Sequence, residues 1–221
     1  MPSKWRMRRI FGPLVKKMAR SFGRAGLSPN GATWIMLLSA CASAIALNLT
    51  YMWVFSVLVF FTGLMDGVDG NIARQFDKKT KLGEFFDSFA DRLSEVVICL
   101  GILGYYTLHQ NVWSNWLPTW FPSIMSWIAY MILGSMLVSY VRARAEIIVK
   151  GDYDVGLFGR SERLFTIVIF SAISLLDWGV IVVAVGALAT AFYRVYKYRA
   201  MLHEVDAGIP QEIQEEETEN N

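Results

Sequence analysis

Long apolar stretches separated by short polar segments dominate the pattern along this chain. A helix needs about 20 apolar residues to cross a bilayer, and several stretches reach or approach that length. They cover residues 32–49, 51–73, 85–108, 124–149, 164–176 and 179–198. The second and fourth run on into charged residues without a break, so these helices should project beyond the hydrocarbon on one side. The pattern predicts an all-α integral membrane protein with about six transmembrane helices.

Residues 1–30 have a different pattern, in which basic residues alternate with spaced apolar ones. The apolar positions recur every three or four residues: Ile10, Leu14, Met18 and Phe22. This spacing predicts an amphipathic juxtamembrane helix on anionic headgroups, started or kinked by Gly12-Pro13. A plain anchor whose charges fix the topology explains the basic residues equally well. A cleaved signal peptide is disfavoured, because no apolar run follows before residue 32.

These patterns divide the chain into three parts. Residues 1–30 form the basic juxtamembrane segment, and residues 31–200 form the six-helix domain. Residues 201–221 are polar and acidic, too poor in apolar side chains to fold alone, so we expect a disordered tail. Hydrophobic residues make up 54% of the chain and charged residues 18%, which argues against a soluble core. Cys41 and Cys99 lie in predicted spans and indicate neither a disulfide framework nor a metal site.

The distribution of Lys and Arg predicts the orientation in the membrane. Residues 1–30 contain basic residues and no acidic one, and the links after the second and fourth spans are also basic. The connections around Thr50, over 109–123 and near Asp177 contain no Lys or Arg. Because cytoplasmic loops carry the excess of positive residues, we expect a multi-pass protein of the cell membrane with both termini in the cytoplasm.

The strongest chemical signal is a run of acidic residues inside apolar sequence. It reads Asp66-x-x-Asp69-Gly70-x-x-Ala73-Arg74, then Gly83-x-x-x-Asp87-x-x-x-Asp91. Residues three or four apart share a helix face, so each pair of aspartates points one way. Four carboxylates in a low-dielectric setting would repel one another and protonate unless cations compensated them. The run therefore predicts divalent metal at the cytoplasmic ends of two adjacent helices, bound by Asp66, Asp69, Asp87 and Asp91.

The residues around these aspartates suit a phosphate ligand. Gly70, Ala73 and Gly83 have little or no side chain, so a bulky ligand can approach the backbone closely. Arg74 could bind phosphate oxygens, or it could be a snorkelling arginine at the inner face. Metal ions held by aspartates can clamp a diphosphate and steady a leaving phosphate, so we expect a nucleotide diphosphate as ligand.

The run from Asp66 to Asp91 resembles the signature of the CDP-alcohol phosphotransferase family, integral membrane enzymes that make phospholipids. Every signature position is matched, and the similar layout extends over residues 25–200. The resemblance implies a CDP-linked lipid whose diphosphate lies on two metal ions, typically Mg²⁺ with Mn²⁺ also possible, and an acceptor hydroxyl that displaces CMP. It implies that Asp66, Asp69 and Asp87 are metal ligands. Asp91 would be both a metal ligand and the catalytic base, and the active protein would be a homodimer.

The segment before the first span, residues 28–33, also resembles the family. The resemblance implies that Asn30 and Thr33 contact the CDP moiety, and that Thr80 in the inner loop does likewise. Helix capping explains Asn30 and Thr33 equally well.

Residues 140–146 and 159–164 are similar to the subgroup that transfers to inositol 1-phosphate, the phosphatidylinositol-phosphate and archaetidylinositol-phosphate synthases. A phosphorylated acceptor needs cations, and four arginines would lie at the inner face: Arg142, Arg160, Arg163 and Arg194. Subgroup members often carry lysine at the position of Arg142. Arg144 could instead pair with Glu146 or Glu162, and all of these arginines could simply fix the topology. Glycerol 3-phosphate would use the same kind of pocket, whereas serine would need less positive charge.

Intramembrane aspartates also mark ion pathways, so a divalent-cation transporter is an alternative from another class. A conducting path would place acids at mid-membrane or on both sides, whereas these gather at one depth. An inactive scaffold is a third possibility, made less attractive by the intact signature. We expect a membrane-embedded enzyme whose active site is cytoplasmic and whose partners are a CDP-lipid and a phosphorylated polyol, with no nucleic acid.

Overall fold

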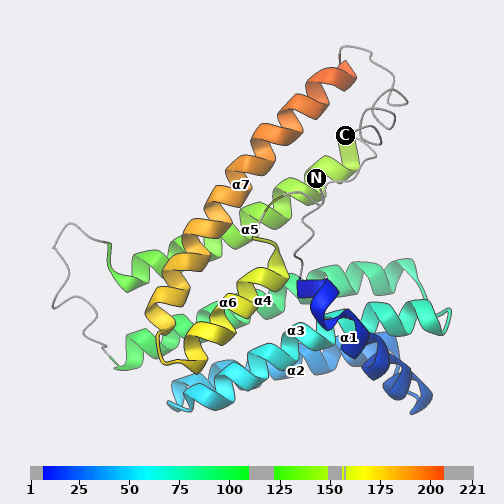
Figure 1. Ribbon diagram of the computed structural model, residues 1–221, viewed down its shortest axis with the longest axis horizontal. Coiled ribbons are helices and arrows are strands. Elements are labelled where there is room, and N and C mark those ends of the chain that lie inside the picture. Colours follow the sequence, from blue (N-terminus) through cyan, green and yellow to red (C-terminus); the bar gives the residue numbers. More distant parts are fainter. Residues whose placement is uncertain (1–6, 110–121, 149–155, 157, 207–221) are drawn as a thin grey trace.

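The structure, a computed structural model, describes residues 7–109, 122–148, 156 and 158–206, and these residues are all-helical. The helices are α1 (Met7–Arg24), α2 (Pro29–Asn48), α3 (Met52–Gln75), α4 (Lys81–His109), α5 (Ile124–Ile148), α6 (Arg160–Ala172) and α7 (Leu176–Asp206) (Figure 1). No strand occurs within the described ranges, which confirms the predicted all-α fold.

Helices α2 to α7 correspond to the predicted spans, but they differ in length and polarity. Four of them, α2, α3, α5 and α7, are long and apolar enough to cross a membrane. Helix α6 has 13 residues, about 20 Å of helix, which is less than the hydrocarbon thickness of a bilayer. Helix α4 has 29 residues and carries the second half of the acidic run. The described residues therefore contain four candidate spans, and a count of six stays a prediction.

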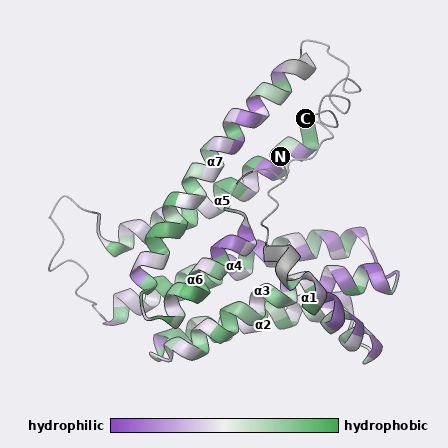
Figure 2. Cartoon of the chain, in the orientation of Figure 1, coloured by the Kyte–Doolittle hydropathy of each residue, from purple (hydrophilic) through white to green (hydrophobic). Residues whose placement is uncertain are grey.

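The helices form two groups with α6 between them. Helix α2 packs on α3 and α4, α5 runs beside α7, and α6 contacts both α3 and α7. In Figure 1 the α5–α7 pair diverges from the group of α2, α3 and α4. Figure 2 shows hydrophilic residues concentrated at the end that holds α1 and the connection between α3 and α4.

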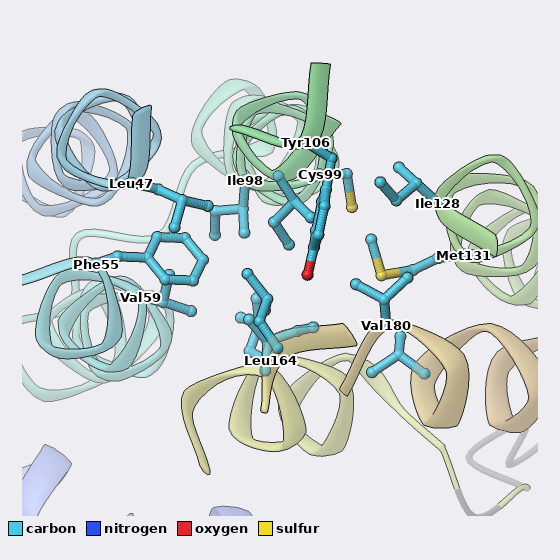
Figure 3. Packing of buried hydrophobic residues seen from close by; sticks show 14 of the residues in the cluster. Leu47, Phe55, Val59, Ile98, Cys99, Tyr106, Ile128, Met131, Leu164 and Val180 are labelled. Carbon is cyan, nitrogen blue, oxygen red and sulfur yellow. The ribbon is translucent and has the colours of Figure 1, made fainter. Parts of the chain in front are cut away.

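A shared hydrophobic core joins the two groups at the opposite end (Figure 3). Every helix from α2 to α7 contributes buried residues to it, among them Leu47, Phe55, Ile98, Ile128, Leu164 and Val180. These side chains come from the end of α2, the start of α3, the second half of α4, the first half of α6 and the starts of α5 and α7. Close packing there fixes the helices relative to one another and leaves the polar end open for cavities.

Helix α1 packs against α3. The side chain of Val15 is buried, and its Cγ1 lies 2.9 Å from where a Cβ on Gly67 would be. Leu14, one of the predicted apolar positions, is 44% exposed, whereas its neighbour Val15 is buried, so the contact with α3 is made beside the predicted apolar positions. Gly12 and Pro13 lie inside the helix and so do not start it.

The predicted boundaries of the three parts also shift. Helix α2 begins at Pro29, inside the segment predicted as juxtamembrane. Helix α7 continues to Asp206, past the predicted boundary at residue 200. The remainder of the predicted tail, residues 207–221, lies outside the described residues.

Candidate active site

Three helices bring their polar residues together at the open end of the molecule. Helix α3 carries Asp66 and Asp69 in its second half, and α4, after a short connection, carries Asp87 and Asp91 in its first half. Because a short connection joins the end of α3 to the start of α4, both pairs lie near the same end of the bundle. Helix α6 adds Arg160, its first residue.

Three of the four predicted metal ligands converge. One carboxylate oxygen each from Asp66, Asp87 and Asp91 lies within 4.8 Å of the others, and all three side chains are partly buried. Such a set of hard oxygen donors is what Mg²⁺ and Mn²⁺ prefer, so the residues present fit a divalent ion.

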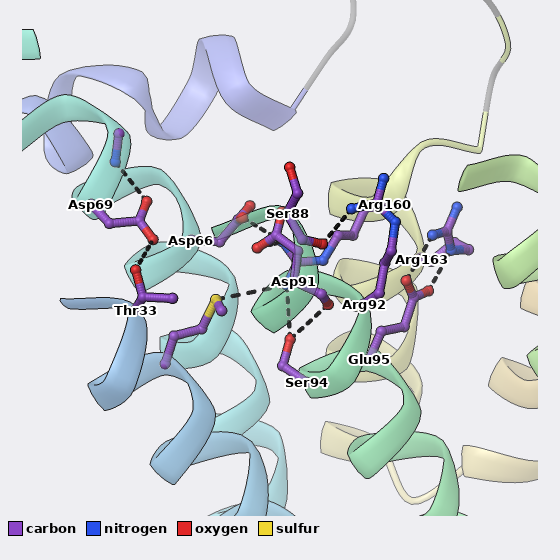
Figure 4. Close-up of polar contacts among 12 residues, drawn as sticks. Thr33, Asp66, Asp69, Ser88, Asp91, Arg92, Ser94, Glu95, Arg160 and Arg163 are labelled. Carbon is purple, nitrogen blue, oxygen red and sulfur yellow. Dashed lines mark hydrogen bonds and ion pairs between the residues drawn. The ribbon is translucent and has the colours of Figure 1, made fainter. Parts of the chain in front are cut away.

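Asp69 is held slightly apart from these three. It is buried, its Oδ2 accepts a hydrogen bond from Thr33 Oγ1 at 3.0 Å, and its Oδ1 accepts one from the Gly70 amide at 2.6 Å (Figure 4). It still interacts electrostatically with Asp87 and Asp66. Helix α2 therefore fixes the position of Asp69 through a contact that the aspartate spacing does not reveal.

Arg160 lies among the converging carboxylates. Its Nη1 bonds to Asp66 Oδ1 and is 2.6 Å from Asp91 Oδ1, while its Nη2 donates to Ser94 Oγ at 2.9 Å (Figure 4). The sequence predicts only a phosphate contact for this arginine. Its aspartate partners were missed because nothing in local spacing relates residue 160 to residues 66 and 91.

Arg163 forms a buried ion pair with Glu95. The Nε–Oε1 distance is 2.6 Å, the Nη2–Oε2 distance is 2.8 Å, and Nη1 also donates to the Phe158 carbonyl at 3.1 Å. A guanidinium with only 2% exposure needs such complete pairing. Arg163 therefore joins α6 to α4. The predicted contact with the acceptor phosphate would have to use the guanidinium that already binds Glu95. Glu95 was missed in the sequence, although an acid one turn after Asp91 in an apolar helix is a usable signal.

An elongated cavity of ≈ 360 Å³, here called the amphipathic cavity, lies between α1, α3 and α6. Its polar end is formed by all four aspartates of the motif. Its other lining residues are mostly apolar, such as Phe60, Leu164 and Phe165, with Lys16, Asn71, Arg74 and Ser161 among them. A cavity with one anionic and one apolar end suits an amphiphile whose headgroup brings or shares cations.

A second cavity of ≈ 430 Å³ lies where α2, α3 and α4 meet, and we call it the glycine cavity. It contains every residue predicted to contact the CDP-lipid: Asn30, Thr33, Gly70, Ala73, Arg74, Thr80 and Gly83. A Cβ on Gly83 would lie 2.8 Å from Thr80 Oγ1, so a larger residue here would displace the Thr80 side chain. Lysines 78, 79 and 81 add positive charge to the rim.

Helix capping accounts for only part of this region. The N-cap of α2 is Ser28, whose Oγ accepts from the Gly31 amide at 3.0 Å. Thr33 lies inside the helix and bonds to Asp69, so capping does not explain it. Thr80 does cap α4, because its Oγ1 accepts from the Gly83 amide at 3.0 Å.

A third cavity of ≈ 280 Å³, the arginine cavity, lies between α4, α5, α6 and α7. Five arginines line it: Arg92, Arg142, Arg160, Arg163 and Arg194. Arg92 was missed in the sequence, where it follows directly after Asp91. Glu146 and Glu162 also line this cavity, which shares Asp66 and Asp91 with the amphipathic cavity.

Two of these arginines have partners from α5. Arg194 is buried, and its Nη1 donates to the Val138 carbonyl at 2.7 Å. Arg142 is partly exposed, and its Nε donates to Glu146 Oε1 at 2.8 Å. Glu146 thus pairs with Arg142, whereas the sequence suggested Arg144 as its partner. Arg144 is exposed and does not line this cavity.

These features describe a helical membrane protein with a cluster of carboxylates at which three cavities meet. The sequence profile of the CDP-alcohol phosphatidyltransferase family matches residues 27–193, and the chain belongs to this family. The family resemblance seen in the sequence is confirmed.

Similar proteins cover most of this chain. Archaetidylinositol phosphate synthase of Pyrococcus horikoshii is 29% identical over 189 residues, which are 85% of this chain and 92% of that protein. Phosphatidylinositol phosphate synthase of Mycolicibacterium smegmatis is 28% identical over 207 residues, 87% of this chain and 86% of that protein.

Solved structures show the same fold. Mycobacterium tuberculosis phosphatidylinositol phosphate synthase with CDP-DAG bound has a TM-score of 0.70 at 24% identity, covering 84% of this chain and 94% of that one. The same enzyme in complex with manganese and citrate has a TM-score of 0.69 at 24% identity, covering 83% and 88%.

Proposed function

We propose that this protein transfers the phosphatidyl or archaetidyl group from a CDP-linked lipid to inositol 1-phosphate and releases CMP. One observation carries the proposal. The arginine cavity and the amphipathic cavity meet at the same two carboxylates, Asp66 and Asp91, so a phosphorylated acceptor and a lipid donor can meet there. The names of the related synthases support this choice of donor and acceptor.

The donor fits the two cavities that α3 separates. The glycine cavity offers Thr33, Arg74 and a lysine rim to a nucleotide, and it shares Asp69 and Asp87 with the amphipathic cavity. The apolar walls of the amphipathic cavity would accept the start of the lipid chains. The diphosphate would then lie at the aspartates, between its nucleotide and its lipid.

Asp66, Asp87 and Asp91, with Asp69 beside them, would hold the metal, and we infer two Mg²⁺ or Mn²⁺ ions per site. Bound there, such ions neutralise a diphosphate and stabilise the phosphate of departing CMP. The complex of a related synthase with manganese supports the choice of ion.

Asp91 would take the proton of the acceptor. It borders the arginine cavity, so an acceptor hydroxyl bound there can lie within hydrogen-bond reach of its carboxylate. The deprotonated oxygen bonds to the lipid-bearing phosphorus, the bond from that phosphorus to the CMP oxygen breaks, and CMP leaves with the electron pair.

The acceptor is inferred from the charges of its cavity. The guanidinium groups suit a phosphate, while Glu146 and Glu162 can accept hydrogen bonds from polyol hydroxyls. Serine carries no phosphate to match the positive charge of this cavity. Glycerol 3-phosphate has fewer hydroxyls for the two glutamates.

The remaining predictions concern the membrane. We propose that α2 to α7 all insert, and that the exposed apolar side chains of α4, among them Leu93 and Leu100, face lipid. The basic N-terminal part and the carboxylates would lie at the cytoplasmic face of the cell membrane, and the active protein would be a homodimer.

A radiochemical assay tests the proposal. Purified protein is incubated with CDP-diacylglycerol, Mg²⁺ and labelled inositol 1-phosphate, glycerol 3-phosphate or serine in parallel. We expect lipid-soluble label and matching CMP release with inositol 1-phosphate, abolished by chelator and restored by Mg²⁺ or Mn²⁺. Faster turnover of glycerol 3-phosphate or serine would make that compound the acceptor in place of inositol 1-phosphate. If no CMP is released with any acceptor, the proposed transferase activity is wrong.

A further inference from the structure

Arg160 contacts two functional regions at once. Its guanidinium bonds to Asp66 and Asp91, two of the three carboxylates that converge, and the same side chain lines the arginine cavity. Its Nε is buried and has no hydrogen-bond partner among the residues that the structure describes. One donor of this arginine is therefore available to a ligand, although Nη1 and Nη2 are used.

A guanidinium and a divalent ion are both cations, and both would bind the carboxylates of Asp66 and Asp91, whose Oδ1 atoms the guanidinium contacts. Like charges a few ångströms apart in a partly buried site repel strongly, so the two cations exclude each other at these atoms. The guanidinium that leaves the carboxylates must find another anion. The arginine cavity lies directly beside it.

We propose that Arg160 couples the metal site to the acceptor pocket. It competes with divalent metal for Asp66 and Asp91, and metal binding releases its guanidinium to bind the phosphate of the acceptor. The coupling rests on the proposed function.

The surrounding contacts permit this movement of one side chain on a fixed backbone. Arg163, one turn further along α6, anchors the helix through its buried pair with Glu95. Arg160 is the first helical residue, and the preceding Gly159 provides no side-chain cap. The side chain of Arg160 can therefore turn while the start of α6 stays in place.

Metal affinity tests the competition. Mn²⁺ binding to purified protein is followed by electron paramagnetic resonance, without any substrate, for the wild type, Arg160→Ala and Arg142→Ala. We expect Arg160→Ala to bind Mn²⁺ at least about tenfold more tightly, as close charge pairs typically couple by that factor or more. Arg142→Ala is the control for the general loss of positive charge. It removes one arginine from the same cavity, and in the wild type Arg142 pairs with Glu146.

The measurement tests the proposed metal site and the proposed coupling separately. If the wild type binds no Mn²⁺, both the proposed metal site and the coupling are wrong. If the wild type binds Mn²⁺ and Arg160→Ala does not tighten it beyond Arg142→Ala, only the coupling is wrong. Arg160→Gln, which keeps most of the side-chain length, is measured alongside in case the alanine variant does not fold.

Phosphate affinity tests the release. Binding of inositol 1-phosphate is measured by calorimetry with and without Mn²⁺. We expect metal to strengthen phosphate binding in the wild type, and linkage requires phosphate to strengthen metal binding by the same factor. The effect should disappear in Arg160→Ala. If it persists there, phosphate binds through the metal alone and the coupling is refuted.

Discussion

At the scale of single residues, Asp91 has the most demanding position. It belongs to the converging carboxylates, pairs with Arg160 and borders two cavities. Asp91→Asn keeps the shape and removes the charge, so it can neither accept a proton nor bind metal well. We expect CMP release to fall by a factor of about 10² to 10⁴, the usual contribution of a general base, while thermal unfolding changes little.

Asp77→Asn is the matched control for this substitution. Asp77 is exposed in the connection after α3, outside all the cavities described above, and its φ of 50° suits asparagine as well as aspartate. Turnover within a factor of two of wild type is expected there. Asp91→Asn with comparable turnover would remove Asp91 from the role of base.

The Glu95–Arg163 pair is a second residue-scale feature, and its energetics follow from burial. Both side chains are almost completely buried, with exposed fractions of 4% and 2%. Glu95→Gln leaves a buried guanidinium without its countercharge, which costs about 3 to 5 kcal/mol of unfolding free energy. Thermal unfolding in detergent should show a much lower melting temperature for Glu95→Gln than for the wild type. Glu162→Gln, an acid one residue before Arg163 that is not fully buried, serves as the control for removing a charge nearby.

At the scale of elements, the docking of α1 on α3 depends on one glycine. A Cβ on Gly67 would lie 2.9 Å from Val15 Cγ1, whereas a Cβ on Gly63 would lie 3.8 Å from its nearest neighbour, Leu164 Cδ1. Gly67→Ala should therefore push α1 away and lower the unfolding free energy by about 1 to 3 kcal/mol. Gly63→Ala should be neutral or stabilising, because alanine favours a helix by about 1 kcal/mol over glycine. Equal stability of the two variants would show that α1 does not need this close approach.

The elements were largely predictable, because hydrophobic length and helical spacing are local properties of the chain. The predicted spans match α2 to α7 in order, and the aspartate spacing led directly to the cluster. Contacts between distant positions were not predictable. Arg160 reaches Asp66 across 94 residues and Arg163 reaches Glu95 across 68, so no periodicity connects them. The contact of Val15 with α3 was not predictable either, because it depends on a partner surface that is distant in sequence.

At the scale of the whole molecule, the glycine cavity and the arginine cavity belong to different groups of helices. The glycine cavity lies within α2, α3 and α4, whereas the arginine cavity is built largely by α5, α6 and α7. The carboxylates of α3 and α4 face both. In the proposed function, the nucleotide of the donor and the acceptor therefore depend on different groups of helices, while α6 lines both the amphipathic cavity and the arginine cavity. A change deep in the α5–α7 pair should then affect only the acceptor.

Arg194→Ala tests this division. Arg194 is buried in α7, bonds to the Val138 carbonyl and lines the arginine cavity. Removing a charge-assisted contact with the acceptor phosphate costs about 1.5 to 3 kcal/mol, so KM for inositol 1-phosphate should rise by a factor of about 10 to 100. KM for the CDP-lipid should stay the same. Arg199→Ala, on an exposed part of the same helix outside this cavity, should change neither value. A rise in the KM for the CDP-lipid with Arg194→Ala would place the donor against α7 and overturn the division.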